Sequence, residues 1–257
     1  MTDIATLRAY LSRNRFMPLP PDELHYVGDG DYRAIGAEFL ERLAQDANLT
    51  PADRVLDIGC GVGRLALPLT QFLDGGSYDG VDPVAAGIAW CASTITPLYP
   101  QVRFQHLDLR HPLYNPGGAL ETARTRIPFA DASFDLICMI SVLTHLERPE
   151  ALHYAAETAR LLAPGGRCFA TAFLMNDPAR AALRKGESLL KFDPASPGPL
   201  YFAIPEAPLA AVAYDEDVLL ELFLRHGLRR RTPAGYGNWS GRVGRSFQDI
   251  CIFEKVS

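Results

Sequence analysis

A run of small and acidic residues after a β-prone stretch has the composition of a ligand cradle. Asp57 is followed by three alternate glycines and a basic residue, which are Gly59, Gly61, Gly63 and Arg64. Glycine at these positions lets the backbone turn tightly from a strand into a helix and lets a ligand approach closely. A dinucleotide fingerprint needs a third glycine at the position of Arg64, and a carboxylate two residues before the first glycine repels a pyrophosphate but attracts a cationic amine. The stretch therefore predicts a ligand with an amino group and disfavours a nicotinamide oxidoreductase.

The segment from Val55 to Ala66 resembles motif I of the class I S-adenosylmethionine-dependent methyltransferases. The resemblance covers the chain from roughly Ala52 to the C-terminus. It implies that S-adenosyl-L-methionine is the cofactor and that the acid and the glycines hold its methionine part. It also implies an α/β, Rossmann-like sheet of seven strands in the order 3-2-1-4-5-7-6, with the last strand antiparallel and helices on both faces.

Two further acids follow predicted strands of this sheet. Asp82 ends the stretch 77–82, about 20 residues past the glycines, where a carboxylate can accept hydrogen bonds from a ribose diol. The alternative is an aspartate that caps the helix expected to begin near Val84. Asp108 follows the predicted strand 102–106, and the resemblance places an acid there near the adenine amino group. The predicted cofactor contacts are Asp57, Gly59, Cys60, Gly61, Gly63, Arg64, Asp82, Asp108, Leu109 and Ser141.

A candidate base follows the stretch 133–141, a nearly continuous apolar run typical of a central parallel strand that is covered on both faces. Its carboxyl end leads through Ser141 to His145. Ligands of open α/β sheets bind beyond the carboxyl ends of the strands. A hydroxyl acceptor must lose its proton during methyl transfer, and an imidazole with a near-neutral pKa suits that role. His145 is therefore the predicted general base, and the alternative is a structural histidine at the start of the next helix.

Aromatic side chains in three other segments are candidates for contact with the acceptor. Tyr26, Tyr32 and Arg33 lie in or beside an aromatic and acidic N-terminal segment, of the kind that often folds over the cofactor in the resembling family. Tyr201 lies in a proline-rich insertion, and Trp239 lies in the loop between the last two predicted strands, where its ring can stack on a flat or sugar-like acceptor. Packing against the domain is the alternative for the N-terminal tyrosines and for Trp239.

The pattern of elements indicates two segments. Residues 1–50 form an N-terminal helical cap, with helices expected over 3–14 and 31–47, and residues 51–257 form the methyltransferase domain. Six prolines between 176 and 213 mark an insertion. Long insertions inside a compact domain are usually functional lids or binding loops, so a lid is expected there.

The composition excludes several other classes. The chain has 257 residues, enough for one α/β domain, and 48% of them are hydrophobic, which is typical of a globular protein. The net charge of −5 argues against a nucleic-acid partner, because phosphate-binding surfaces are usually basic. The five cysteines include no C-x-x-C pair, so neither a disulfide framework nor a zinc site is expected. No leader pattern and no apolar run of about 18 residues occurs, so we expect a cytoplasmic protein without membrane partners.

These features predict O-methylation of a small molecule such as a sugar, a glycoside or a related metabolite. The segment around Tyr114-Asn115-Pro116 and the loop 237–242 look similar to bacterial methyltransferases of that type. No Asp/Asn cluster resembles the metal site of catechol-type enzymes, so metal-independent catalysis is expected. A homo-oligomer is left open. Two alternatives also stay open: N-methylation of a small amine, and a non-catalytic module that binds S-adenosylmethionine, since fold does not settle function.

Overall fold

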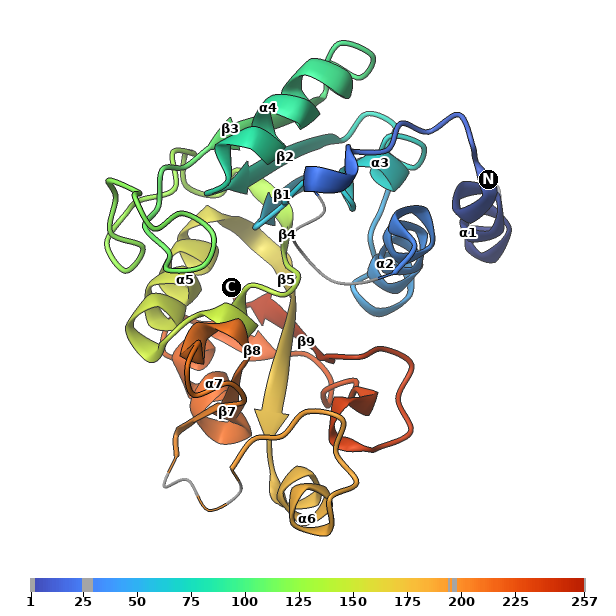
Figure 1. Cartoon of the computed structure of the whole chain (residues 1–257). Coiled ribbons are helices and arrows are strands. Elements are labelled where there is room, and N and C mark those ends of the chain that lie inside the picture. Colours follow the sequence, from blue (N-terminus) through green and yellow to red (C-terminus); the bar gives the residue numbers. More distant parts are fainter. Residues whose placement is uncertain (1–2, 25–29, 194, 196–197, 257) are drawn as a thin grey trace.

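The glycine-rich stretch begins at the carboxyl end of a central strand, β1 (Arg54–Ile58). In the computed structural model, β1 lies between β2 (Ser77–Asp82) and β4 (Phe134–Met139), and all three strands are parallel (Figure 1). β3 (Val102–His106) pairs with β2, and β5 (Leu162–Met175) pairs with β4, again in parallel. Most residues of β1, β2 and β4 are buried, which explains why β1 and β4 are largely apolar in sequence. The structure describes residues 3–24, 30–193, 195 and 198–256.

Antiparallel strands complete the sheet beyond β5. β9 (Asp249–Lys255) runs antiparallel to residues 167–172 of β5, and β8 (Leu228–Arg230) pairs with β9. The order β3-β2-β1-β4-β5-β9-β8 is the predicted order, with the final strand antiparallel and inserted beside the fifth, so the predicted fold class is confirmed. The strand count differs, because the described sheet has nine strands. The two additional strands, β6 (Leu200–Phe202) and β7 (Val212–Asp215), pair with each other, and β7 pairs with residues 173–175 of β5.

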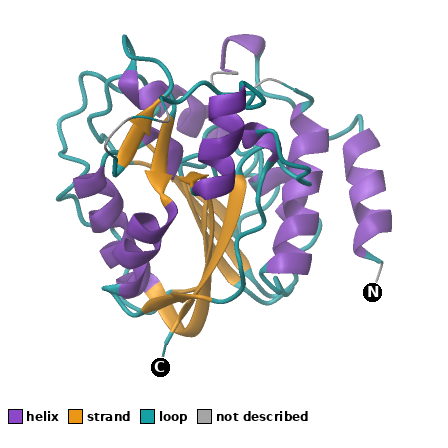
Figure 2. Cartoon of the chain, turned by 90° about the horizontal axis from the view of Figure 1, so that it is seen from below, coloured by secondary structure: helices purple, strands orange, loops and turns teal. Residues whose placement is uncertain are grey.

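Helices cover both faces of the sheet (Figure 2). α2 (Tyr32–Asp46), α3 (Ala66–Leu69) and α4 (Ala85–Thr94) contribute to the hydrophobic core on one face, and α1 (Ile4–Arg13) packs against α2. α5 (Arg148–Leu161) and α7 (Glu216–Leu224) contribute to the core on the other face. Both helices expected before residue 50 are present. Asp31 begins α2 by accepting a hydrogen bond from the backbone N–H of Ala34 at 2.7 Å, as an N-cap aspartate does.

The insertion after β5 is a folded layer. It contains α6 (Asp177–Lys185), β6 and the 3-10 turn η3 (Pro208–Ala210), none of which the sequence analysis assigned. A small core holds this layer on the outer end of β5, and its largest members are Phe173, Phe192, Tyr201 and Trp239. The elements of the layer are short and are stabilised by this cluster, so no long periodic pattern marks them in the sequence.

Two further features of the described chain concern its cysteines and its helices. All five cysteines are buried free thiols, and burial raises the pKa of each of them, so they are poor nucleophiles. Within the described ranges, none of the helices combines the length and apolar character needed to cross a bilayer.

Candidate active site

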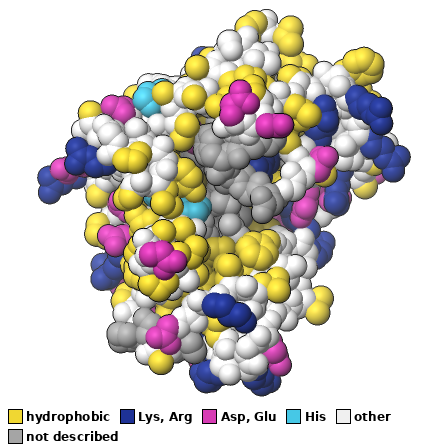
Figure 3. Space-filling view, viewed as in Figure 1, with side chains coloured by type: hydrophobic (Ala, Val, Ile, Leu, Met, Phe, Trp, Pro, Cys, Tyr) yellow, Lys and Arg dark blue, Asp and Glu magenta, His cyan; other side chains and the backbone are white. Residues whose placement is uncertain are grey.

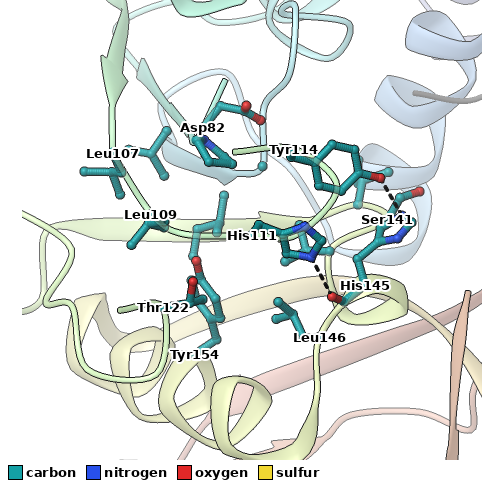
Figure 4. A pocket seen from close by; sticks show the side chains of 16 residues that line it. Asp82, Leu107, Leu109, His111, Tyr114, Thr122, Ser141, His145, Leu146 and Tyr154 are labelled. Atoms are coloured by element: carbon teal, nitrogen blue, oxygen red, sulfur yellow. Dashed lines mark hydrogen bonds between the residues drawn. The ribbon is translucent and has the colours of Figure 1, made fainter. Parts of the chain in front are cut away.

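Two cavities adjoin at the carboxyl ends of β1 and β4, and Gly59, Ile140 and Ser141 line both of them. The first, here called the glycine cavity, is lined by the glycine-rich loop together with Asp57 and Arg64. The second, here called the histidine cavity, is the one drawn in Figure 4. Its polar side chains are Asp82, His111, Thr122, Ser141 and His145 with the hydroxyls of Tyr114 and Tyr154. Together the cavities form an elongated site where open α/β sheets bind ligands.

The glycine-rich loop needs its glycines for conformation and for space. Gly59, Gly61 and Gly63 have φ values of 77°, 54° and 72°, in the left-handed region that favours glycine. A Cβ added to Gly59 would lie 2.6 Å from Cγ2 of Val142, so a side chain there would displace the residue that follows Ser141. The hydroxyl of Tyr32 donates to the carbonyl oxygen of Val62 at 2.7 Å and thereby links α2 to the loop.

Asp57 is a buried carboxyl group in the wall of the glycine cavity. The hydroxyl of Tyr78 donates to its Oδ2 at 2.7 Å. Burial raises the pKa of Asp57 to about 7, with the nearby carboxylate of Asp82 acting in the same direction. A cation placed in the glycine cavity would favour the ionised form, so this acid is suited to bind an amine.

Asp82 connects the glycine loop to the end of β2. Its Oδ2 accepts from the backbone N–H of Gly61 at 2.8 Å, and its Oδ1 accepts from the backbone N–H of Val84 at 2.8 Å. The residue at the N-cap position of α4 is Val84, so Asp82 is not the cap residue of that helix. Its carboxylate lines the histidine cavity, where a diol could donate to it.

Ser141 has a strained backbone at the point where the two cavities meet. Its φ is 58°, which is uncommon for a residue with a side chain and is found preferentially at functional sites. Its backbone N–H donates to Oγ1 of Thr171 at 2.8 Å, and Nε2 of Gln248 donates to its Oγ at 3.0 Å. Residues of β5 and of the segment just before β9 therefore hold the end of β4 in place.

His145 lies in the 3-10 turn η2 (Leu143–His145), ahead of α5. Its Nδ1 is 2.8 Å from the carbonyl oxygen of Leu209, and because a carbonyl only accepts, Nδ1 carries the proton. Nε2 of the neutral ring then holds the lone pair and accepts from the hydroxyl of Tyr114 at 3.1 Å (Figure 4). Burial lowers the pKa of His145 below its ordinary value of 6.5, against the opposing effect of the Leu209 bond, and His111 lowers it further.

His111 supports this arrangement from the loop after β3. Its Nδ1 accepts from the backbone N–H of Leu113 at 3.2 Å, so Nε2 carries the proton and donates to the carbonyl oxygen of His145 at 2.9 Å. The ring of Tyr114 contacts the rings of both histidines, with centroid distances of 4.9 Å to His111 and 5.3 Å to His145. We refer to His111, Tyr114 and His145 as the Tyr-His cluster. Burial, and next the charge of Asp82, raise the pKa of Tyr114 to about 12, so its phenol stays protonated.

The structure brings most of the predicted cofactor residues together. Those that line one or both cavities are Asp57, Gly59, Cys60, Gly61, Arg64, Asp82, Leu109 and Ser141. Gly63 lines neither cavity, and its φ of 72° shapes the turn. Asp108 lies outside both linings, and its carboxylate closes the following loop by accepting from Nδ2 of Asn115 at 2.8 Å and from the backbone N–H of Ala119 at 3.2 Å. Its contact with adenine stays a prediction.

Two predicted acceptor contacts, Tyr201 and Trp239, are buried side chains in the structure. Trp239 is 0% exposed, and its indole N–H donates to Oδ2 of Asp249 at 2.7 Å. Tyr201 is also buried, and its hydroxyl accepts from Nη2 of Arg180 at 2.7 Å. Both rings pack in the cluster beneath the insertion, where Phe173 and Phe192 contact the ring of Trp239 and the guanidinium of Arg180 lies over the ring of Tyr201.

The N-terminal candidates have different outcomes. Tyr32 is buried against the glycine loop, where it positions backbone and offers no exposed ring to an acceptor. Arg33 donates to the carbonyl oxygen of Met17 at 3.0 Å and so fastens the segment before α2. Tyr26 lies outside the described residues.

Sequence reasoning missed four contributors: Tyr114, Thr171, Gln248 and the carbonyl of Leu209. One signal was available for Tyr114, since the loop after a parallel strand lies at the carboxyl edge of the sheet, where the ligand binds. His106, which precedes this loop, is exposed, and its Nε2 lies 3.1 Å from the carbonyl oxygen of Pro83. Within the part of the chain that the structure describes, the His, Cys, Asp and Glu side chains form no group of three or more that could hold a metal ion.

Comparison with known proteins agrees with this geometry. Residues 55–166 match a family model described as a methyltransferase domain. The chain is 30% identical over 135 residues to 27-O-demethylrifamycin SV methyltransferase of Amycolatopsis mediterranei, covering 52% of this chain and 44% of that protein. It is 31% identical over 150 residues to a phthiotriol/phenolphthiotriol dimycocerosates methyltransferase of Mycobacterium leprae, covering 57% and 47%. The chain thus spans about half the length of the curated relatives it matches.

A solved structure has the same fold with a product of the cofactor bound. It is the 1,6-didemethyltoxoflavin-N1-methyltransferase of Burkholderia thailandensis with S-adenosylhomocysteine, at a TM-score of 0.55 and 18% identity over 88% of this chain and 78% of that one. The site described above fits S-adenosylmethionine. Asp57 is a buried acid suited to an amine, Asp82 is an acid suited to a diol, and the glycine loop between them leaves no room for side chains. The chain is therefore similar to methyltransferases over residues 55–166, and its site has the groups that S-adenosyl-L-methionine, the cofactor of the resembling class I family, would need.

Proposed function

We propose that this protein transfers the methyl group of S-adenosylmethionine to a hydroxyl oxygen of a small molecule. The observation that carries the proposal is the neutral imidazole of His145 in the wall of a cavity that also contains Asp82 and Ser141. The Leu209 carbonyl holds its proton on Nδ1, which leaves Nε2 as the basic nitrogen. A base is needed for a hydroxyl acceptor, whereas an amine can enter already deprotonated.

In this proposal the residues of the chain bind the cofactor, orient the acceptor and remove the acceptor's proton. Asp57 binds the amino group at the methionine end of the cofactor, and Asp82 binds the ribose diol. When bound, the cofactor supplies a methyl group on a positively charged sulfur. Holding two reactants in attack geometry can supply roughly 7–11 kcal/mol of the barrier. His145 takes the acceptor proton, a contribution of about 10²–10⁴-fold for general bases.

The proposed acceptor is a sugar, a glycoside or a related hydroxylated metabolite. The histidine cavity combines a few polar groups with apolar walls, which is typical of small-molecule sites. On the face in Figure 3, Lys and Arg side chains are scattered and form no single patch for a nucleic acid. The name of the Amycolatopsis relative also places its missing methyl group on an oxygen. Residues 1–50 would act as the cap, and the insertion 176–213 as a lid whose Leu209 orients the base.

A methyl-transfer assay tests the proposal. Transfer of a labelled methyl group to a panel of sugars, phenols, carboxylates and amines is measured for the wild type and for His145→Ala. We expect transfer to a hydroxyl compound that falls by about 10²-fold or more in the variant. His153→Ala is the matched control, because His153 bonds to the carbonyl oxygen of Thr125 and lines neither cavity. Transfer confined to amines, or hydroxyl transfer indifferent to His145, would overturn the proposal.

A further inference from the structure

Both ring nitrogens of His145 already have hydrogen-bond partners. Nδ1 donates to Leu209, and the lone pair of Nε2 accepts the hydroxyl proton of Tyr114. An acceptor therefore cannot bond to the basic nitrogen while Tyr114 holds this position. Either Tyr114 moves away, or the acceptor reaches the base through the phenol oxygen.

The surroundings of Tyr114 favour the second route. Its ring lies against the rings of His111 and His145. Its loop is closed by a reciprocal pair of backbone bonds between His111 and Asn115, at 3.0 and 2.9 Å. The loop is held further by the bond from Asn115 to Asp108 and by the bond from His111 to the His145 carbonyl. Swinging the phenol out would disturb this set of contacts, whereas using it in place disturbs none.

We propose that Tyr114 is a catalytic residue that relays the acceptor proton to His145. The inference rests on the proposed function, because it requires a hydroxyl acceptor. The acceptor O–H donates its proton to the phenol oxygen of Tyr114 while the phenol proton passes to Nε2 of His145. The acceptor oxygen forms the new O–C bond as the S–C bond breaks, and the sulfur keeps that electron pair as a neutral thioether. The proton gained by the imidazole then leaves to solvent.

The chemical state of Tyr114 suits this role. A relay must hold a proton to give and a lone pair to accept another, and a neutral phenol has both. The pKa of about 12, raised by burial and by Asp82, keeps the phenol neutral over the range in which an enzyme works. The phenol oxygen gains the acceptor proton in the same step in which it gives its own proton to His145, so a tyrosinate need not form. The ring lines the same cavity as Asp82 and Ser141.

Kinetics of Tyr114→Phe test the relay. We expect kcat for hydroxyl transfer to fall by about 10²-fold or more, the loss typical of proton-transfer groups, with cofactor affinity unchanged. The double variant Tyr114→Phe/His145→Ala should be no slower than the slower single variant, since both changes remove one proton path. Tyr99→Phe is the matched control, because it removes a hydroxyl bonded to Gln71 and far from both linings. If kcat of Tyr114→Phe equals or exceeds that of the wild type, Tyr114 merely covers the base, and the relay is wrong.

A titration of His145 separates failure of the relay from failure of the proposed function. The Tyr114 hydroxyl stabilises the neutral imidazole, so its removal should raise the pKa of His145, as followed by NMR in the wild type and in Tyr114→Phe. An unchanged pKa would overturn the relay even where hydroxyl transfer proceeds. A raised pKa in a protein that methylates no hydroxyl compound would overturn the proposed function, and with it the relay, while confirming the hydrogen bond.

Discussion

Asp57 has opposite effects on folding and on ligand binding. Its pKa is about 7 in the folded chain against an ordinary value of 3.8, because it is buried. Between these two pH values the unfolded chain loses the proton that the folded chain keeps, so the stability contribution of Asp57 falls as pH rises from about 4 to about 7. A bound amine reverses this penalty by pairing with the carboxylate. Asp57 therefore lowers the stability of the folded chain when no amine is bound.

Replacement of Asp57 by Asn should separate these effects. We expect the ligand-free variant to be more stable than the wild type at pH 8, by roughly 1–4 kcal/mol, because no buried charge forms. Binding of S-adenosylhomocysteine should weaken by more than about tenfold, because the amine loses its carboxylate. Urea unfolding at pH 5 and pH 8 together with calorimetric titration would measure both quantities. Asp79→Asn, which alters only an ion pair with Arg103, is the control. Wild-type affinity for S-adenosylhomocysteine in Asp57→Asn would disprove the proposed contact between Asp57 and the amino group.

The protonation of His145 predicts how kcat depends on pH on the acid side of its pH profile. Its pKa lies below 6.5, so the imidazole is neutral and competent at pH 7. We expect kcat to decrease as pH falls through that lowered pKa, and the limb to vanish in the residual activity of His145→Ala. A pH series of initial rates checks this. An acid limb centred above 6.5, or one that survives in the variant, is incompatible with His145 as the base.

The position of His145 could be inferred from the sequence, but its state could not. The apolar run of β4 predicts the strand, and the residues after a central parallel strand face the ligand site. The carbonyl that sets the tautomer belongs to Leu209, 64 positions away in the insertion. No local pattern connects the two, so only the folded chain reveals which nitrogen is basic.

The insertion and the loop before β9 form one element with a core of its own. Ser188 of the insertion joins them by donating from Oγ to the carbonyl oxygen of Trp239 at 2.9 Å. Asp249 fastens the loop to β5 by accepting from the backbone N–H groups of Leu174 and Gly237 and from the indole N–H of Trp239. The sequence leaves two roles open for Trp239, stacking on an acceptor or packing against the domain, and in the structure the ring is packed. The aromatic partners that bury it are Phe173 and Phe192, which are 66 and 47 positions distant in the numbering.

Trp239→Phe distinguishes the two roles of this ring. The change leaves a cavity and removes a donor from buried Asp249, so we expect a loss of about 1–3 kcal/mol in the free energy of unfolding. The acceptor KM should stay unchanged, because the ring meets neither cavity. Denaturant unfolding measures the free energy of unfolding, and steady-state kinetics measure the acceptor KM. A raised KM without a loss of stability would restore the predicted contact with the acceptor.

Across the whole molecule, the sequence predicted the parallel half of the sheet better than its outer end. β1, β2 and β4 are mostly buried, and in β1 and β4 this burial produces largely apolar runs with clear limits. β6 and β7 have three and four residues and form because β5 extends far enough to pair with β7. The layer that β5 supports was not predicted, because its elements are short.

The cofactor should stabilise the whole chain, because its site joins the ends of several strands. With S-adenosylhomocysteine at 100 times its Kd, linkage gives about 2.7 kcal/mol of added stability. We expect a rise in Tm of roughly 5–10 °C, measured by differential scanning calorimetry. Asp82→Asn should abolish most of the rise, and Asp79→Asn should keep it. An equal rise in both variants would place the cofactor away from Asp82.

The most direct test of the account is a single-turnover measurement of methyl transfer. Enzyme loaded with labelled S-adenosylmethionine is mixed with a hydroxylated acceptor identified from the panel, and the label in the product is located by mass spectrometry. The account predicts a methyl ether, formed at a rate that falls about 10²-fold or more in His145→Ala. Label on nitrogen, or an ether formed equally fast without the imidazole, would contradict it.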